Sequence, residues 1–460
     1  MARFFRLLLI ALRGSETNFT SGGINRAIFL LAIPMILEMF MESLFTIADL
    51  FFVARIGTEA IATVGLTESL LTLVYAIAIG LSTAASAVVA RRIGEDNSRA
   101  AGTTIAQLIV LSLAMALLLG IPGFVLAEDG LRLMGGSKQL VVNGADFTHL
   151  MFASVPAIML LHTLSGCLRG AGEASRAMRS LWLANGVNIV LCPLLIFGWG
   201  PFPELGVLGS AVATTTGRTL GVLYQLAILL RRSDTVQIQR TDFTPVGAII
   251  RNLLRLAAGG TGQSLIGSAS WVFLTRLVAT FGSEALAGYT IALRILMFSV
   301  VPAWGMGNAA ATLVGQNMGA GQLERAETSV WRATFVNIVL LSLVGVLFYG
   351  SAYDIVSFFD HDPRVVAIAG ACLRVLCLGY GAYAVNMVIS EAINGAGDTR
   401  TPTLLNFVCF WLVQIPLAYA LATLHWGPSG VFWSVPISEI LLTLLLVWAF
   451  RRGRWKSVQV

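Results

Sequence analysis

Charged residues are scarce in this sequence. Only 12% of the 460 residues are Asp, Glu, Lys or Arg, whereas soluble domains carry roughly a quarter. Hydrophobic residues make up 57%, and uncharged apolar runs recur along the whole chain. These runs are too long for the strands of a membrane barrel and do not alternate with polar residues, so only helices can satisfy their backbone in lipid. The sequence therefore predicts an all-α integral membrane protein.

Cysteine and histidine are also few. Five cysteines occur, with no CxxC pair and an odd total, so the sequence indicates neither a disulfide framework nor a zinc site. No HExxH or phosphate-binding glycine loop is present either. We therefore expect no enzyme activity, no metal and no cofactor.

Twelve apolar runs have the length that a bilayer core of about 30 Å requires. The first extends over residues 26–52, and the others centre near Ile79, Leu113, Met159, Val190, Ala227, Ser268, Val300, Val339, Val385, Phe410 and Leu444.

Positive charge is distributed unevenly between the connecting segments. With the N-terminus inside, 22 of the 30 Lys and Arg residues fall in inner segments and 5 in outer ones. The positive-inside rule then places both termini in the cytoplasm. The orientation of the chain in the membrane accounts for the positive charge, so we expect no nucleic-acid partner. Residues 4–12 are apolar but short, and we expect them to lie on the membrane surface rather than to form a signal peptide.

The chain repeats itself at an offset of 225 residues. Arg26 falls on Arg251, and the loop at 170–173 (GAGE) falls on 395–398 (GAGD). Six spans per half give two parallel repeats, an architecture of transporters, so we expect two six-helix lobes around a central cavity. The boundaries that follow are an N-terminal segment 1–23, a first lobe 24–231, a linker 232–247, a second lobe 248–452 and a tail 453–460.

Several glycine-rich patterns carry a family resemblance. They are the run GQNMGAG at 315–321 followed by ERA at 324–326, the run LRGAG at 168–172, and the stretch from 206 to 214. In this order the patterns resemble the multidrug and toxic compound extrusion (MATE) family over about residues 24–450. The resemblance implies a secondary transporter that exports cationic or amphiphilic compounds in exchange for protons or sodium ions.

The first span contains three acids, Glu38, Glu42 and Asp49. At about 100° per residue they share one narrow helix face. An ionised carboxylate at the bilayer centre costs at least about 2.5 kcal/mol, so this face should line a polar cavity. A proton or cation relay is one interpretation, and a structural hydrogen-bond network is the other. Glu38 and Glu68 of the second span are expected to line the substrate cavity.

In the second half, the positions equivalent to the three acids hold Gln263, Gly267 and Leu274. The second half has lost the carboxylates, so we assign ion coupling to the first half. Gln263 is expected to line the substrate cavity from the second half. The resemblance implies that Asp49 is the cation-sensing residue.

The fifth span presents Asn185, Asn188 and Cys192 on one face. Similar transporters have an aspartate where Cys192 stands, and a thiol is a poor ligand for sodium, so protons are favoured while sodium stays open. His162 in the fourth span titrates near neutral pH and is a candidate for the relay or, alternatively, a packed histidine. Thr214 of the sixth span is expected to complete the cluster.

The function predicted from these observations is a monomeric antiporter in contact with membrane lipid, which exports organic cations or amphiphiles by alternating access. A flippase or exporter of a lipid-linked or metabolite substrate is the alternative. That substrate would favour a basic cavity, and few arginines lie within the spans.

Overall fold

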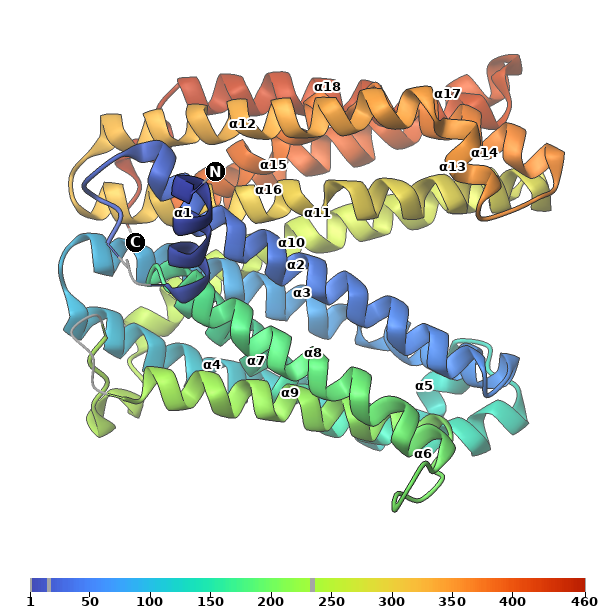
Figure 1. Cartoon of the computed structure of the whole chain (residues 1–460), viewed down its shortest axis with the longest axis horizontal. Coiled ribbons are helices and arrows are strands. Elements are labelled where there is room, and N and C mark those ends of the chain that lie inside the picture. The colour runs from blue at the N-terminus through green and yellow to red at the C-terminus, as the bar shows by residue number, and fades with distance from the viewer. Residues whose placement is uncertain (1, 15–17, 232–235, 460) are drawn as a thin grey trace.

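The computed structural model describes residues 2–14, 18–231 and 236–459, and throughout these ranges the secondary structure is helical, with no strand (Figure 1). Parts of the expected N-terminal segment, linker and tail, namely 1, 15–17, 232–235 and 460, lie outside the described residues. The all-α prediction is confirmed.

Six helices or helix pairs form each half. Within the described residues, eight helices and two bent helix pairs are long and apolar enough to cross a membrane, and the helices Val207–Leu229 and Gly247–Ala279 do not meet that test. The first half comprises α2 (Ile24–Ala54), α3 (Thr58–Gly94), α4 (Ser98–Val125), the pair α6 (Lys138–Ala153) and α7 (Val155–Gly170), α8 (Ala174–Phe197) and α9 (Val207–Leu229). The second comprises α10 (Gly247–Ala279), α11 (Ser283–Gly319), α12 (Leu323–Gly350), the pair α14 (Pro363–Cys377) and α15 (Tyr380–Gly395), the pair α16 (Arg400–Asn406) and α17 (Ile415–Leu421), and α18 (Pro428–Arg451). The bounds of α3 and α11, and of α4 and α12, differ by the 225-residue offset of the repeat.

Three spans that the sequence predicts as continuous are interrupted. The α6–α7 pair bends by 41° and the α14–α15 pair by 52°. Pro156 in the first turn of α7 has no backbone N–H to continue the preceding helix, which explains the first break. Eight π-helical residues, Phe407–Gln414, separate α16 from α17 just before Pro416, and this wider turn takes up the missing hydrogen bond.

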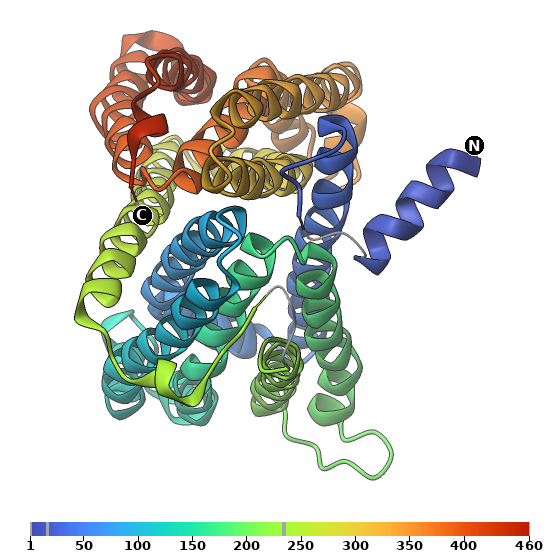
Figure 2. The same cartoon turned by 90° about the vertical axis from the view of Figure 1, so that its left-hand side faces the viewer.

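The ends of the chain gather at one end of the bundle, which we call the terminal end. It carries α1 (Ala2–Arg13), the short helix η1 (Arg240–Phe243) of the linker and η4 (Arg454–Ser457) (Figures 1 and 2). The opposite end, the far end, carries α5 (Ala127–Leu133) and α13 (Ala352–Ser357).

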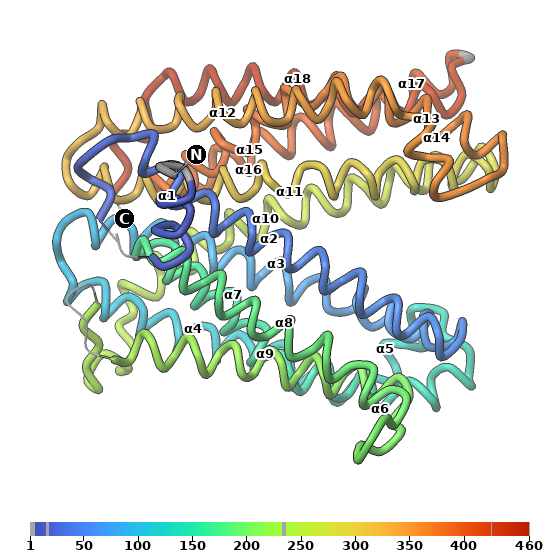
Figure 3. The backbone as a smooth tube through the Cα atoms, viewed as in Figure 1, coloured from blue at the N-terminus to red at the C-terminus, as the bar shows by residue number. Residues whose placement is uncertain are grey.

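The two halves pack closely through glycines near the terminal end. A Cβ added at Gly80 of α3 would lie 2.4 Å from the Ala257 carbonyl oxygen of α10, and one at Gly94 would lie 2.0 Å from the Gln316 carbonyl oxygen of α11. Small residues allow this approach of helix backbones in membranes. Toward the far end the helices of the two halves diverge (Figure 3).

Both terminal segments bridge the halves. Arg325 of α12 donates hydrogen bonds to the carbonyl oxygens of Phe19, Ser21 and Gly22, just before α2. In the tail, Lys456 pairs with Glu327 of α12 at 2.6 Å. The Val458 carbonyl oxygen accepts a hydrogen bond from Arg91 of α3 in the first half at 2.5 Å. The terminal end is thus closed by helix packing and by two chain segments.

The described part of the linker binds the start of α4. The buried Asp242 accepts two hydrogen bonds from the guanidinium of Arg99, one of them 2.6 Å long, and one from Thr103. Burial alone would raise the pKa of the Asp242 carboxyl, but the hydrogen bonds from Arg99, from the Gln239 backbone and from Thr103 lower it below its usual value. The linker is therefore fixed to the first half.

Replacing Gly94 by valine should force α3 and α11 apart, because the new side chain meets backbone that cannot move aside. Overpacking of this kind costs about 1–3 kcal/mol, so the melting temperature in detergent should fall by several degrees. Gly65→Val is the matched control, since Gly65 lies in α3 with open space around it. Equal melting temperatures of the two variants would contradict close packing at Gly94.

Asp242→Asn should release the linker at neutral pH, because the amide removes the charge that holds Arg99. Amide hydrogen exchange over 237–246 should become about tenfold faster, as expected for the loss of a hydrogen bond to a charged group. In the wild type, a lowered pKa means that the stabilisation is present above the unfolded value of about 3.9 and is lost only as the pH falls through the folded pKa. The rate of amide hydrogen exchange over 237–246, corrected for the intrinsic pH dependence of exchange, should therefore stay constant from neutral pH down to the folded pKa of Asp242. The exposed Asp146→Asn serves as control.

Candidate functional site

The three acids of α2 bind three different helices of the first half. Glu38 accepts a hydrogen bond from Arg169 of α7 at 2.6 Å, and the pair is buried, with exposures of 2% and 9%. Arg169 also donates to Ser82 of α3 at 2.8 Å. Glu38, which we expected to line the substrate cavity, instead forms a buried ion pair. The guanidinium of Arg169 neutralises its charge inside the protein.

Asp49 lies in a small polar cluster. Its Oδ1 atom accepts a hydrogen bond from the Ser210 hydroxyl of α9 at 2.7 Å and lies 3.5 Å from the Cys192 sulfur of α8. Cys192 is fully buried, and Ser210 nearly so. Asp49, the cation-sensing residue that the resemblance implies, thus lies beside Cys192, where similar transporters have an aspartate.

Two further contacts connect the same helices. Asn185 of α8 donates to Glu42 at 3.1 Å, and Asn188 donates to the Thr214 hydroxyl of α9 at 2.8 Å. Six of the seven residues expected to couple ions therefore lie in contacts among α2, α8 and α9. The expected residues are Asp49, Glu42, Asn188, Asn185, His162, Thr214 and Cys192.

The remaining expected residue, His162, lies on α7 with its ring edge-to-face against Tyr75 of α3, at 6.2 Å between ring centroids. His162 also interacts electrostatically with Glu42 and Arg218, so the relay and the packed histidine both stay predictions. Glu68 of α3 is exposed and interacts electrostatically with both Asp49 and Arg218.

Arg218 of α9 was not expected at the site. Its guanidinium donates to the Tyr75 hydroxyl at 2.9 Å and lies over the rings of Tyr75 and Phe45, at 5.6 and 5.9 Å from their centroids. It is only 9% exposed and interacts electrostatically with Glu42 and Asp49. Arg218 is thus a resident cation among the carboxylates. Its position one helical turn after Thr214 was the available sequence signal.

Gln263 forms a separate pair in the second half. Its side-chain amide exchanges two hydrogen bonds with Asn394 of α15, at 3.0 and 3.1 Å. Gln263 and Asn394 stand 225 residues after Glu38 and Arg169, so the two pairs occupy equivalent places in the repeat. One half holds an ion pair where the other holds a neutral amide pair.

The Glu38–Arg169 pair adjoins the contact between the halves. Thr312 of α11 donates to the Arg169 carbonyl oxygen at 3.2 Å, and Gln316 donates to the Gly170 carbonyl oxygen at 3.3 Å. The backbone that carries the arginine is therefore held by the second half.

The side chains in contact with Asp49 are one hydroxyl and one thiol. Over the described ranges, no three His, Cys, Asp or Glu side chains lie close enough together to hold a metal ion. One carboxylate with a hydroxyl and a thiol can take up and release a proton, but it offers few of the hard oxygen ligands that sodium requires.

The neutral pair of the second half suggests a test of the charged one. Arg169→Asn alone leaves Glu38 buried without its counterion and should destabilise the protein by about 3–5 kcal/mol. The double variant Glu38→Gln with Arg169→Asn copies the Gln263–Asn394 pair and should recover part of this loss, measured by thermal unfolding. Arg132→Asn with Glu128→Gln, an exposed pair on α5, should change little. A double variant as unstable as Arg169→Asn would contradict the equivalence of the two pairs.

Comparison with known proteins places this geometry in a family. The MatE family model matches residues 34–194 and 262–420, one match in each half. The chain is 24% identical over 442 residues to the probable multidrug resistance protein YoeA of Bacillus subtilis, with 95% of each chain covered. It is also 24% identical to an FAD transporter of Shewanella oneidensis, covering 94% of this chain and 95% of that protein.

A solved structure agrees with the whole fold. An outward-facing conformation of a multidrug resistance MATE family transporter superimposes with a TM-score of 0.89 at 26% identity, covering 95% of this chain and 98% of that one. The family match covers more than half of the chain, and its two parts follow the repeat. The chain therefore belongs to the MatE family of membrane transporters and is not an enzyme.

Proposed function

We propose that the protein is an antiporter that exports cationic or amphiphilic compounds in exchange for protons. The observation that carries this proposal is the Asp49 cluster, a carboxylate within a membrane span whose neighbours are a hydroxyl and a thiol. The relatives named as multidrug resistance proteins support an export function.

Charge balance supplies the mechanism. Glu42, Asp49 and Glu68 are countered within the first half by Arg218, so an ionised site has excess negative charge that favours an organic cation. Protonation of Asp49 removes one of these charges and weakens the attraction. The Ser210 hydroxyl, which donates to the ionised carboxylate, then loses a good acceptor. Proton uptake thus disfavours the bound cation and changes the contact between α2 and α9.

We assign the terminal end to the cytoplasm. It carries the segments in which most of the arginines lie, as the positive-inside rule requires for a bacterial inner membrane. Because the halves pack closely at this end and diverge at the other, the conformation is the one open to the outside. Each chain contains a complete cluster within one half, so a monomer is sufficient for function.

Export of a metabolite is the second candidate. One relative is named as an FAD transporter, and Arg218 places a buried cation beside the acids, which suits a substrate that carries an anionic group. The drug antiporter and the metabolite exporter differ in the substrate that they carry, and both would use the same fold.

The antiport proposal predicts proton-driven dye transport that depends on Asp49. In inverted membrane vesicles, an imposed proton gradient should drive ethidium accumulation, and a sodium gradient alone should not. Asp49→Asn should reduce the rate at least about tenfold, because the amide cannot exchange a proton. Ser210→Ala should give a smaller loss.

Asp129→Asn is the matched control, since Asp129 lies on α5 at the far end and pairs only with the exposed Arg132 within the described contacts. Unchanged transport by Asp49→Asn would refute coupling through the first half, and transport driven by sodium alone would refute proton coupling. Movement of a flavin but not of ethidium would favour the metabolite exporter.

A further inference from the structure

The helix α1 has no part in the proposed transport mechanism. Figure 2 shows it at the terminal end, running sideways out of the bundle and across the direction of the spanning helices. A helix that crosses the direction of the spanning helices at one end of the bundle has the orientation of a helix that lies in a membrane surface.

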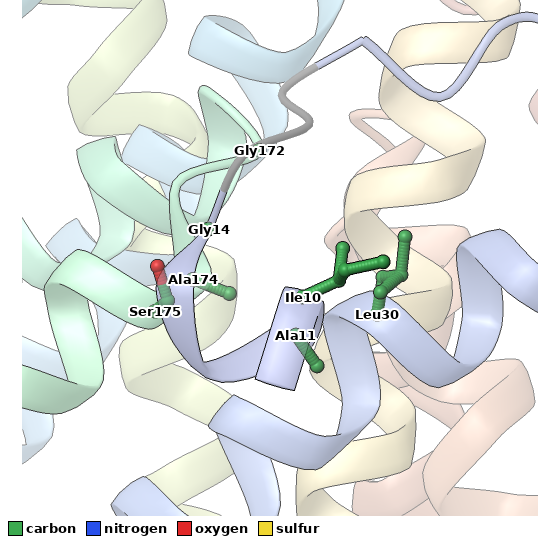
Figure 4. A pocket seen from close by; sticks show the side chains of 7 residues that line it. All are labelled: Ile10, Ala11, Gly14, Leu30, Gly172, Ala174 and Ser175. Carbon is green, nitrogen blue, oxygen red and sulfur yellow. The ribbon is translucent and has the colours of Figure 1, made fainter. Parts of the chain in front are cut away.

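The C-terminal end of α1 is fixed to the first half. The Arg179 guanidinium of α8 donates to the carbonyl oxygens of Leu12 and Arg13, each at 2.7 Å, and so caps the helix. Gly14 follows with a φ of +66° and leaves no room for a Cβ, which would lie 1.8 Å from the Ser175 hydroxyl. A small pocket lies where this end meets α2 and α8. It is lined by Ile10, Ala11, Gly14, Leu30, Gly172, Ala174 and Ser175 (Figure 4).

The other end of α1 extends beyond this anchor and exposes apolar side chains. Phe5 and Leu9 are 59% and 53% exposed, and their spacing of four residues puts them on one face. Ala11, on a different face, is buried against the protein at 2% exposure. The exposed apolar face is therefore separate from the face that the protein covers.

Basic side chains flank the apolar face. Arg6 and Arg13 are both exposed and, seven residues apart, share one side of the helix. An apolar face beside a basic face is the pattern of helices that lie in the boundary between acyl chains and anionic headgroups. α1 lies level with the beginnings of α2 and α8 at the terminal end.

We propose that α1 binds anionic phospholipid of the leaflet at the terminal end, with Phe5 and Leu9 among the acyl chains and Arg6 and Arg13 at the headgroups. The positive charge of the two arginines is complementary to the negative charge of the lipid headgroups. This role does not depend on the transported substrate or the coupling ion.

The test uses the full chain with Leu9→Cys labelled by an environment-sensitive fluorophore. The five native cysteines are all buried, so the label is directed to position 9. The labelled protein is placed in nanodiscs of phosphatidylcholine alone or of phosphatidylcholine with phosphatidylglycerol. Spin-labelled lipid should quench the probe, iodide should not, and phosphatidylglycerol should increase the lipid quenching. Thr241→Cys in the exposed linker should behave in the opposite way.

Charge reversal separates anionic recognition from simple apolar contact. Arg6→Glu with Arg13→Glu should reduce the lipid quenching in phosphatidylglycerol nanodiscs at least about fivefold. Arg240→Glu, which reverses an exposed charge of the linker at the terminal end, should leave the lipid quenching unchanged. Free access of iodide to position 9 in both lipids would overturn the proposal, and so would quenching that is equal with and without phosphatidylglycerol. Unchanged elution and melting temperature verify that each variant is folded.

Discussion

The cost of removing a carboxylate from water dominates the architecture of the first half. A span with three acids is tolerated only where other helices supply partners. The protein provides a different solution for each acid of α2: a guanidinium from α7 for Glu38, an amide from α8 for Glu42 and a hydroxyl from α9 for Asp49. These partners require α7, α8 and α9 to surround one face of α2. Glu42 and Asp49 have neutral hydrogen-bond partners and interact with Arg218 only electrostatically, whereas Glu38 is bound in an ion pair.

Much of this arrangement could be predicted from the sequence, because it depends on local periodicity and on the repeat. The shared face of the acids, the facing asparagines and the place of Cys192 follow from helical spacing alone. The individual partners do not. His162 packs on Tyr75 and Gln263 pairs with Asn394, since each side chain meets whichever group a distant helix brings near. The position of Arg218 within a span does not show by itself which acids another helix brings near its guanidinium.

The duplicated halves show which features belong to the scaffold and which to the chemistry. Helix lengths, the bent spans and the position of the Glu38–Arg169 pair recur in the second half, where Gln263 and Asn394 replace the charges. Geometry was therefore preserved after duplication while ionisable groups were retained unequally. A neutral pair keeps the same packing at every pH, so the second half offers a support whose contacts at this place do not change with protonation.

The segments at the two ends of the chain also have a kinetic meaning. Both attach to neighbouring positions at the start of α12, through Arg325 and Glu327, and the tail continues to Arg91 of the first half. Their hydrogen bonds have to break together before the halves can separate at this end. Contacts of this kind raise the activation barrier of the conformational exchange without altering which ion or substrate is bound. The ends of the chain would then determine how often the transporter switches, while the interior determines what each switch carries.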